Sequence, residues 1–148
     1  TGQALRDETA ARYHEQGLAA EVTAFVEDMA AAYQWADLAI CRSGAMTVSE
    51  LAAAGLPAIL VPYPHAIDDH QTANAHVLAD DGAAVLMPQA NLTPESLATV
   101  LRSLLDEPET LSAMSQAARL KARPEAAKTV AAVCLAAVAD APKNEDNP

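Results

Sequence analysis

The sequence predicts an α/β fold, a Rossmann-like parallel sheet with helices on both faces. Short apolar runs alternate with helical segments four times along the chain. The run at 58–61 has no polar alternation, which is typical of a parallel strand covered on both faces. Gly17, Gly55 and Gly82 fall where helices are expected to end. Because strand–helix repeats form right-handed crossovers, they predict one parallel sheet.

The predicted elements follow from apolar periodicity and from helix-start signals. Strands are expected at 21–25, 38–41, 58–61 and 84–87. Helices are expected at 3–15, 29–36, 47–54, 70–81, 94–106, 108–120 and 125–139. Asp28 is a predicted N-cap, and Thr93 followed by Pro94 gives an N-cap with proline at the first helical position. The domain is expected to cover 1–140, and the polar tail 141–148 is expected to be disordered.

Composition and charge disfavour several classes of partner. The 148 residues include 20 acidic and 9 basic side chains, a formal charge of −11. No basic stripe interleaved with aromatic residues is present, so no nucleic acid is expected. An anionic membrane surface would repel the chain, and no apolar run is long enough for a bilayer. The chain opens without an initiator methionine and directly in a helical pattern, so we expect a piece of a longer protein.

The sequence predicts no metal site, no cofactor and no catalytic set. Cys41 and Cys134 fit no zinc-ligand spacing, and both are expected to be small buried residues in a reducing compartment. Asp68 and Asp69 lie between two histidines but match no standard metal site; one of them is expected to cap the following helix. Neither GxGxxG nor GxxxxGK[ST] occurs, and no serine has a histidine–aspartate arrangement nearby.

The stretch CRSGAMTVSE, residues 41–50, connects a predicted strand to a helix and allows two interpretations. Amide groups at a helix N-terminus favour an anion such as a phosphate, and small side chains let a ligand approach the backbone. Thr47 and Glu50 also match a capping box, in which Glu50 folds back onto the Thr47 N–H. Arg42 could meet a phosphate, or form a salt bridge with Asp37 or Glu50.

Two other strand-to-helix loops carry candidate residues. Gln71 lies in the first turn of a predicted helix, where its amide could contact sugar hydroxyls or only solvent. Phe25 and Val26 precede the helix at 29–36 and are most simply core or staple residues. Backbone polar groups at that position could also pair with the edge of a flat base.

The motifs CRSGAMTVSE, AAAGLPA and QTANA resemble the C-terminal domain of glycosyltransferase family 28, which has the GT-B fold. The resemblance is strongest at 22–74 and extends more weakly to about 139. It implies an inverting transferase that moves GlcNAc from UDP-GlcNAc onto lipid I to make lipid II for peptidoglycan. It places the full-length enzyme at the cytoplasmic face of the bacterial inner membrane. The chain would lack the domain's first strand and glycine-rich loop as well as the N-terminal acceptor domain, and would be inactive alone.

The resemblance also implies roles for individual residues. The backbone of Val26 would pair with uracil, Glu50 would accept the two ribose hydroxyls, and Gln71 would contact the GlcNAc hydroxyls. The nucleotide-sugar cradle would consist of Ala45, Met46, Thr47, Val48 and Ser49. Because this agrees with the helix N-terminus at 41–50, a ligand role for Glu50 is favoured over the cap. The alternatives are a subunit of a split family-28 transferase and a non-catalytic interaction module, and an exposed sheet edge makes self-association an expectation.

Overall fold

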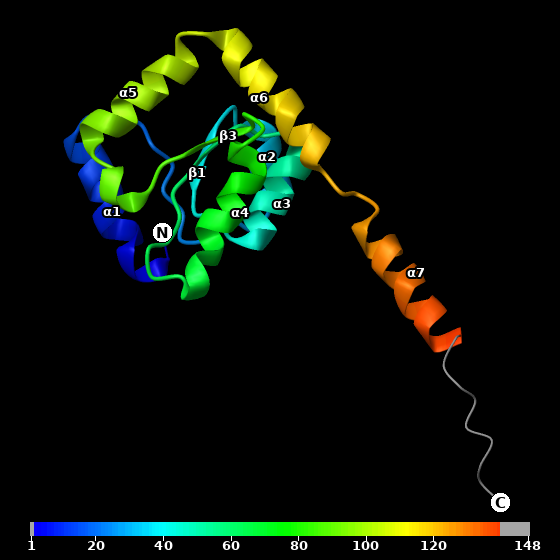
Figure 1. Cartoon of the computed structure of the whole chain (residues 1–148). Helices are drawn as coiled ribbons and strands as arrows, with labels where there is room; N and C mark the ends of the chain where they lie inside the picture. The colour runs from blue at the N-terminus through cyan, green and yellow to red at the C-terminus, as the bar shows by residue number, and fades with distance from the viewer. Residues whose placement is uncertain (1, 140–148) are drawn as a thin grey trace, which may run out of the picture. The chain divides into compact units, whose positions relative to one another are not determined.

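The structure, a computed structural model, describes residues 2–139 apart from the side chains at 67 and 108. The predicted tail at 141–148 lies outside this range. The described residues form two compact units, one that ends at Ala36 and one that begins at Asp37. Figure 1 follows the elements along the chain by colour. Each unit is described by itself below.

The first unit contains the helices α1 (Gln3–Glu15) and α2 (Met29–Trp35). Asp28 caps α2 as predicted, because its Oδ1 accepts a hydrogen bond of 2.8 Å from the Ala31 N–H. That bond satisfies one of the amide groups that have no partner within a helix.

The predicted strand at 21–25 does not form, so this prediction was wrong. A β-favouring composition makes a strand only where a neighbouring strand supplies hydrogen bonds. Here the Ala24 carbonyl accepts one bond of 3.0 Å from the Gly2 N–H, and no ladder develops. The core or staple role of Phe25 and Val26 was also wrong, since they are 80% and 40% exposed.

The second unit is built on a parallel sheet of three strands in the order β1-β2-β3. The strands are β1 (Ala39–Cys41), β2 (Ala58–Leu60) and β3 (Ala84–Leu86). Cys41 is in register with Leu60, and Leu60 with Leu86, so the three carboxyl ends meet at one edge. Three of the four predicted strands are thus confirmed.

The helices of this unit confirm the predicted alternation. They are α3 (Ala45–Ala54), α4 (His70–Ala79), α5 (Pro94–Leu105), α6 (Pro108–Lys121) and α7 (Ala126–Ala139), with short 3₁₀ turns η1 (Ile67–Asp69) and η2 (Gln89–Asn91). Gly55 ends α3 at φ 68°, a left-handed conformation that a residue with a Cβ adopts only at a cost. No helix within residues 2–139 combines the length and the apolarity needed to span a bilayer.

The core lies on both sides of the sheet, as the pattern at 58–61 predicts. Ile59 and Val61 pack in one cluster with Leu104 of α5 and Met114 of α6. Leu60 is fully buried, and α4 packs against β3. In Figure 1 the helices α3 and α4 lie on the opposite side of the strands from α5. The α/β class with helices on both faces is therefore confirmed, and it leaves the carboxyl edge of the strands to the connecting loops.

The two cysteines differ from the prediction and from each other. Cys41 is half-buried at the end of β1, where burial raises the pKa of its thiol. Cys134 on α7 is exposed, so the expectation that both are buried was wrong. An apolar run predicts a helix, but it does not say what covers that helix.

Candidate functional site

The loops after β1, β2 and β3 all begin at the carboxyl edge of the sheet. In open parallel sheets this edge is where ligands bind, and the helices that follow the strands direct their N-termini there. The candidate site therefore consists of the starts of α3 and α4 with the loops that lead into them.

Helix α3 begins at Ala45, two residues earlier than predicted, because alanine and methionine are good helix formers directly after the turn. Gly44 is its N-cap, at φ −63° and ψ 148°, and no side chain caps the helix. Thr47 is then the third helical residue and Glu50 the sixth. A capping box needs the N-cap and the third position, so the interpretation of Thr47 and Glu50 as a capping box was wrong.

The side chains of the predicted cradle have different environments. Val48 is buried in the core, and its N–H donates to the Gly44 carbonyl at 2.9 Å, inside the helix. The Ser49 hydroxyl donates to the Ala45 carbonyl at 3.0 Å. Met46 is exposed and Thr47 is half-buried. The first turn, 45–47, is therefore the part of α3 whose amide groups lack an acceptor one turn earlier in the helix.

Glu50 lies one turn beyond that amide group, on the same side of α3. Met46 and Thr47 precede it by four and three positions, which places the three side chains on one helix face. Glu50 is exposed. The structure thus brings an amide-rich turn and a carboxylate together along a single face.

The start of α4 is joined to the start of α3 through Ser43, Gln71 and Asn74. The Ser43 hydroxyl donates to the Gln71 carbonyl at 2.8 Å, and the Asn74 Nδ2 donates to the Ser43 carbonyl at 3.1 Å. The side-chain Oε1 of Gln71 accepts from the Tyr63 N–H at 3.0 Å. Since that oxygen is engaged, the Nε2 end of Gln71 is the end that can donate to a ligand.

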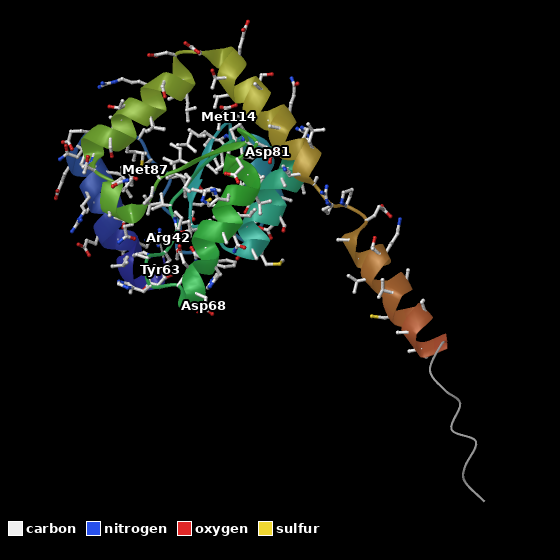
Figure 2. All side chains as sticks on the ribbon, viewed as in Figure 1. Arg42, Tyr63, Asp68, Asp81, Met87 and Met114 are labelled. Atoms are coloured by element: carbon white, nitrogen blue, oxygen red, sulfur yellow. The ribbon has the colours of Figure 1, made fainter. Side chains whose placement is uncertain are left out.

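Arg42 connects the loops that follow all three strands. Its Nη1 donates to the carbonyls of Val61 at 3.2 Å and Pro62 at 3.0 Å, and its Nη2 donates to Gln89 Oε1 at 2.7 Å. The guanidinium lies over the Tyr63 ring, 5.5 Å from its centroid, and Figure 2 shows the two side by side. The partners of Arg42 are neutral oxygens rather than the predicted phosphate or carboxylate. Its role in the structure is to hold the loops together.

The prediction that Asp68 or Asp69 caps α4 was wrong. Asp69 occupies the N-cap position without a side-chain bond to the backbone, and its Oδ1 instead accepts from the Thr72 hydroxyl at 2.6 Å. Asp68 and Asp69 have φ values of 53° and 51°, which are uncommon for residues with a side chain. Such conformations cost free energy, so the contacts around this loop must impose them.

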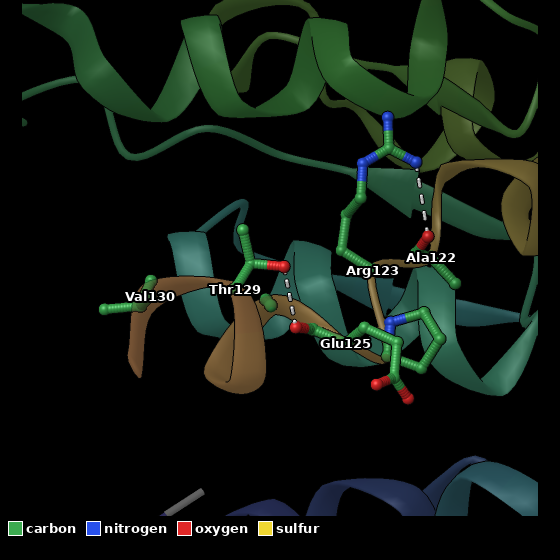
Figure 3. Close-up of a pocket in the computed structure, with 7 residues that line it drawn as sticks. Ala122, Arg123, Glu125, Thr129 and Val130 are labelled. Carbon is green, nitrogen blue, oxygen red and sulfur yellow. Dashed lines mark hydrogen bonds between the residues drawn. The ribbon is translucent and has the colours of Figure 1, made fainter. Parts of the chain in front are cut away.

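Two other features are less suited to a polar ligand. A pocket at the junction of α6 and α7 is lined mainly by apolar groups and backbone, with Thr129 turned back onto the Glu125 carbonyl at 3.1 Å (Figure 3). Within residues 2–139 no group of three histidine, cysteine, aspartate or glutamate side chains is placed to hold a metal ion. Val26, the remaining predicted site residue, belongs to the first unit and is partly exposed.

Sequence reasoning missed Ser43 and Asn74. The spacing of QTANA contains the signal, because residues 71 and 74 are one helical turn apart and lie on one face. What the spacing does not contain is the acceptor, a carbonyl that is distant in the sequence.

Comparison with known proteins agrees with the fold and with the motifs. Residues 1–130 match the family model described as the glycosyltransferase family 28 C-terminal domain. A Methylococcus capsulatus protein is 65% identical over 91% of this chain, and one from Pseudomonas putida is 60% identical over 86%. Both are named UDP-N-acetylglucosamine–N-acetylmuramyl-(pentapeptide) pyrophosphoryl-undecaprenol N-acetylglucosamine transferase.

A crystal structure of MurG from Acinetobacter baumannii superposes on this fold with a TM-score of 0.86 at 44% identity. The match covers 91% of this chain but 41% of that protein. Likewise, the chain spans 38% and 35% of the lengths of the two curated relatives. On the agreement of the family model, the relatives and the fold, the chain belongs to glycosyltransferase family 28 and carries its C-terminal domain.

Proposed function

We propose that this chain is the donor-binding part of a transferase that moves GlcNAc from UDP-GlcNAc to undecaprenyl-pyrophosphoryl-MurNAc-pentapeptide. The printed activity of its relatives and its family membership support this proposal. The acceptor site would lie in the larger part of such enzymes that the chain does not match, at the cytoplasmic face of the membrane. The chain alone is expected to be inactive.

The observation that carries the proposal is the uncapped start of α3. Its first-turn amide groups, at 45–47, have no side-chain cap and follow a strand end at the ligand-binding edge. The diphosphate of a nucleotide sugar is the kind of anion that such a helix start binds. During an inverting displacement the acceptor hydroxyl attacks the anomeric carbon, and negative charge develops on the leaving UDP. The positive end of the α3 dipole would stabilise that charge.

The other assigned residues recognise the two ends of the donor. The carboxylate of Glu50 accepts the ribose hydroxyls, one helical turn beyond the diphosphate. Gln71 donates from Nε2 to an oxygen of GlcNAc, because its Oε1 is held by the Tyr63 N–H. The backbone of Val26 pairs with uracil. The amide groups of Ala45, Met46 and Thr47 contribute most to the cradle, while Val48 and Ser49 support it from within the helix.

The substitution Glu50→Gln in the complete transferase tests this proposal. We expect the donor KM to rise about 10- to 100-fold, because a hydrogen bond to a charged acceptor contributes roughly 1.5–3 kcal/mol. The kcat is expected to change little, since ribose contacts are the same in the ground and transition states. The unfolding free energy should change by less than about 1 kcal/mol, because the side chain is exposed and caps nothing.

The matched control is Glu109→Gln, which removes an exposed carboxylate from the first turn of α6. It should leave the donor KM unchanged. An unchanged donor KM in Glu50→Gln, measured at saturating acceptor, would contradict the proposal.

Self-association remains part of the proposal for the chain by itself. β1 is an edge strand of the described sheet, and Ile40 within it is 48% exposed. An unpaired edge with apolar side chains favours pairing with another chain.

A further inference from the structure

Ser43 is buried and polar, and both of its polar groups are bonded to the same helix. It has no accessible surface, and it immediately precedes Gly44, the N-cap of α3. Its hydroxyl donates to the Gln71 carbonyl at 2.8 Å, while its carbonyl accepts from Asn74 Nδ2 at 3.1 Å. Gln71 and Asn74 are three positions apart, so they lie on one face of α4. Two hydrogen bonds therefore fix the start of α3 against the first turn of α4.

The chemistry of the pair is directional. A carbonyl accepts only, so the Ser43 carbonyl requires a donor, and the amide of Asn74 supplies one. Because Ser43 is completely buried, solvent cannot replace that donor while the loop keeps its position. Any loss of the bond must be accommodated by a shift of the turn at Ser43 relative to α4.

We propose that Asn74 is a positioning residue that fixes the separation between the amide groups at the start of α3 and the side chain of Gln71. The inference rests on the proposed function, in which these groups bind the diphosphate and the sugar. It adds that the two binding sites act as one unit because Ser43 and Asn74 connect them. Asn74 itself touches no ligand in this assignment.

The expected consequence is a selective loss. UDP engages the α3 side of the site but not Gln71, so replacing Asn74 should affect UDP binding little. UDP-GlcNAc uses both sides, and misplacement by a fraction of an ångström removes the benefit of the Gln71 contact. A residue that merely stabilises the fold would weaken both ligands equally.

Calorimetric titration of the complete transferase with UDP and with UDP-GlcNAc tests the inference. The variants are Asn74→Ala, Gln71→Ala and the double variant, and the control is His76→Ala, an exposed position of α4. We expect Asn74→Ala to weaken UDP-GlcNAc about 10-fold and UDP less than about threefold, with the control unchanged. The double variant should bind UDP-GlcNAc no more weakly than Gln71→Ala, because coupled residues are non-additive.

Equal losses for the two ligands in Asn74→Ala, or additive losses in the double variant, would overturn the inference alone. If Asn74→Ala does not fold, Ser43→Ala gives the same measurement, since it removes only the hydroxyl bond to Gln71 and keeps the carbonyl. That variant must show the same preference for losing UDP-GlcNAc, and equal losses there would overturn the inference as well. If the unaltered enzyme binds neither ligand, the proposed function fails and takes the inference with it.

Discussion

Helices α3 and α5 begin in opposite ways. Thr93 caps α5 with a capping box, in which its hydroxyl accepts from the Ser96 N–H at 3.1 Å and the Ser96 hydroxyl accepts from the Thr93 N–H at 2.9 Å. Helix α3 begins at Gly44 with no side-chain cap. Both helices have a threonine near the start, but only Thr93 occupies the N-cap position.

The difference separates a helix start that is complete from one that is available to a ligand. In α5 the chain's own hydroxyls satisfy orphan amide groups, so the start contributes to stability. In α3 the corresponding groups are left to the carboxyl edge of the sheet, where an anion can bind them. A glycine N-cap weakens the helix slightly and lets a ligand approach the backbone.

The largest effect is expected from Gly44→Asp, which gives α3 the cap that it lacks. The new carboxylate would bind the first-turn amide groups and repel a diphosphate, so donor affinity should fall about 100-fold in the complete transferase. Thermal stability should remain equal or rise slightly, because aspartate exceeds glycine as an N-cap by roughly a few tenths of a kcal/mol. Donor titration and thermal unfolding of the same preparation measure the two effects.

Gly44→Ala is the matched control for that substitution. The position has φ −63°, and an added Cβ would meet only Thr47 Oγ1, at 3.8 Å. The alanine variant should therefore fold and bind the donor within a few-fold of the original. Donor binding by Gly44→Asp at normal affinity would show that these amide groups bind no anion.

A smaller effect is expected from Thr93→Ala, which removes the cap of α5. The unfolding free energy should fall by about 1 kcal/mol, with no change in donor binding. The parallel variant Thr47→Ala should change the unfolding free energy by less than about 0.5 kcal/mol, because Thr47 caps nothing. Denaturant unfolding of both variants checks the contrast, and equal losses would restore a capping role for Thr47.

The smallest effect concerns acid pH at the start of α5. The backbone N–H of Glu95 and the Thr93 hydroxyl lower the pKa of the Glu95 carboxyl below 4.5. A carboxyl with a lowered folded-state pKa stabilises the fold above its unfolded pKa, and this contribution is lost as the pH falls through the folded value. Glu95→Gln should therefore flatten the pH dependence of the unfolding free energy just below pH 4.5. A first turn without acidic residues, as in α3, adds no such dependence.

Element type was predictable wherever the local pattern and the packing agreed. The apolar run at 58–61 became β2, and Thr93 with Pro94 began α5 at the predicted residue. The segment at 21–25 failed because its β-favouring composition meets no neighbouring strand. Cys134 failed because the periodicity of α7 does not determine what covers it.

The candidate site was predictable as a loop but not as a set of contacts. The motif at 41–50 indicated a helix start at a strand end, and the structure places it there. The motif was ambiguous about Glu50, and a shift of two residues in the helix start removed the capping alternative. The ligand roles of the assigned residues remain predictions.

By itself, the sequence determined the α/β class, the order of the second unit's elements and the loop at which an anion would bind, because these follow from periodicity and from small residues beside a strand. Only the tertiary structure decided which polar groups are used up and which are exposed. Arg42 is engaged by the carbonyls after β2, and Ser43 by α4. Those partners lie 19 or more positions away in the chain, so packing selects them and no local pattern can.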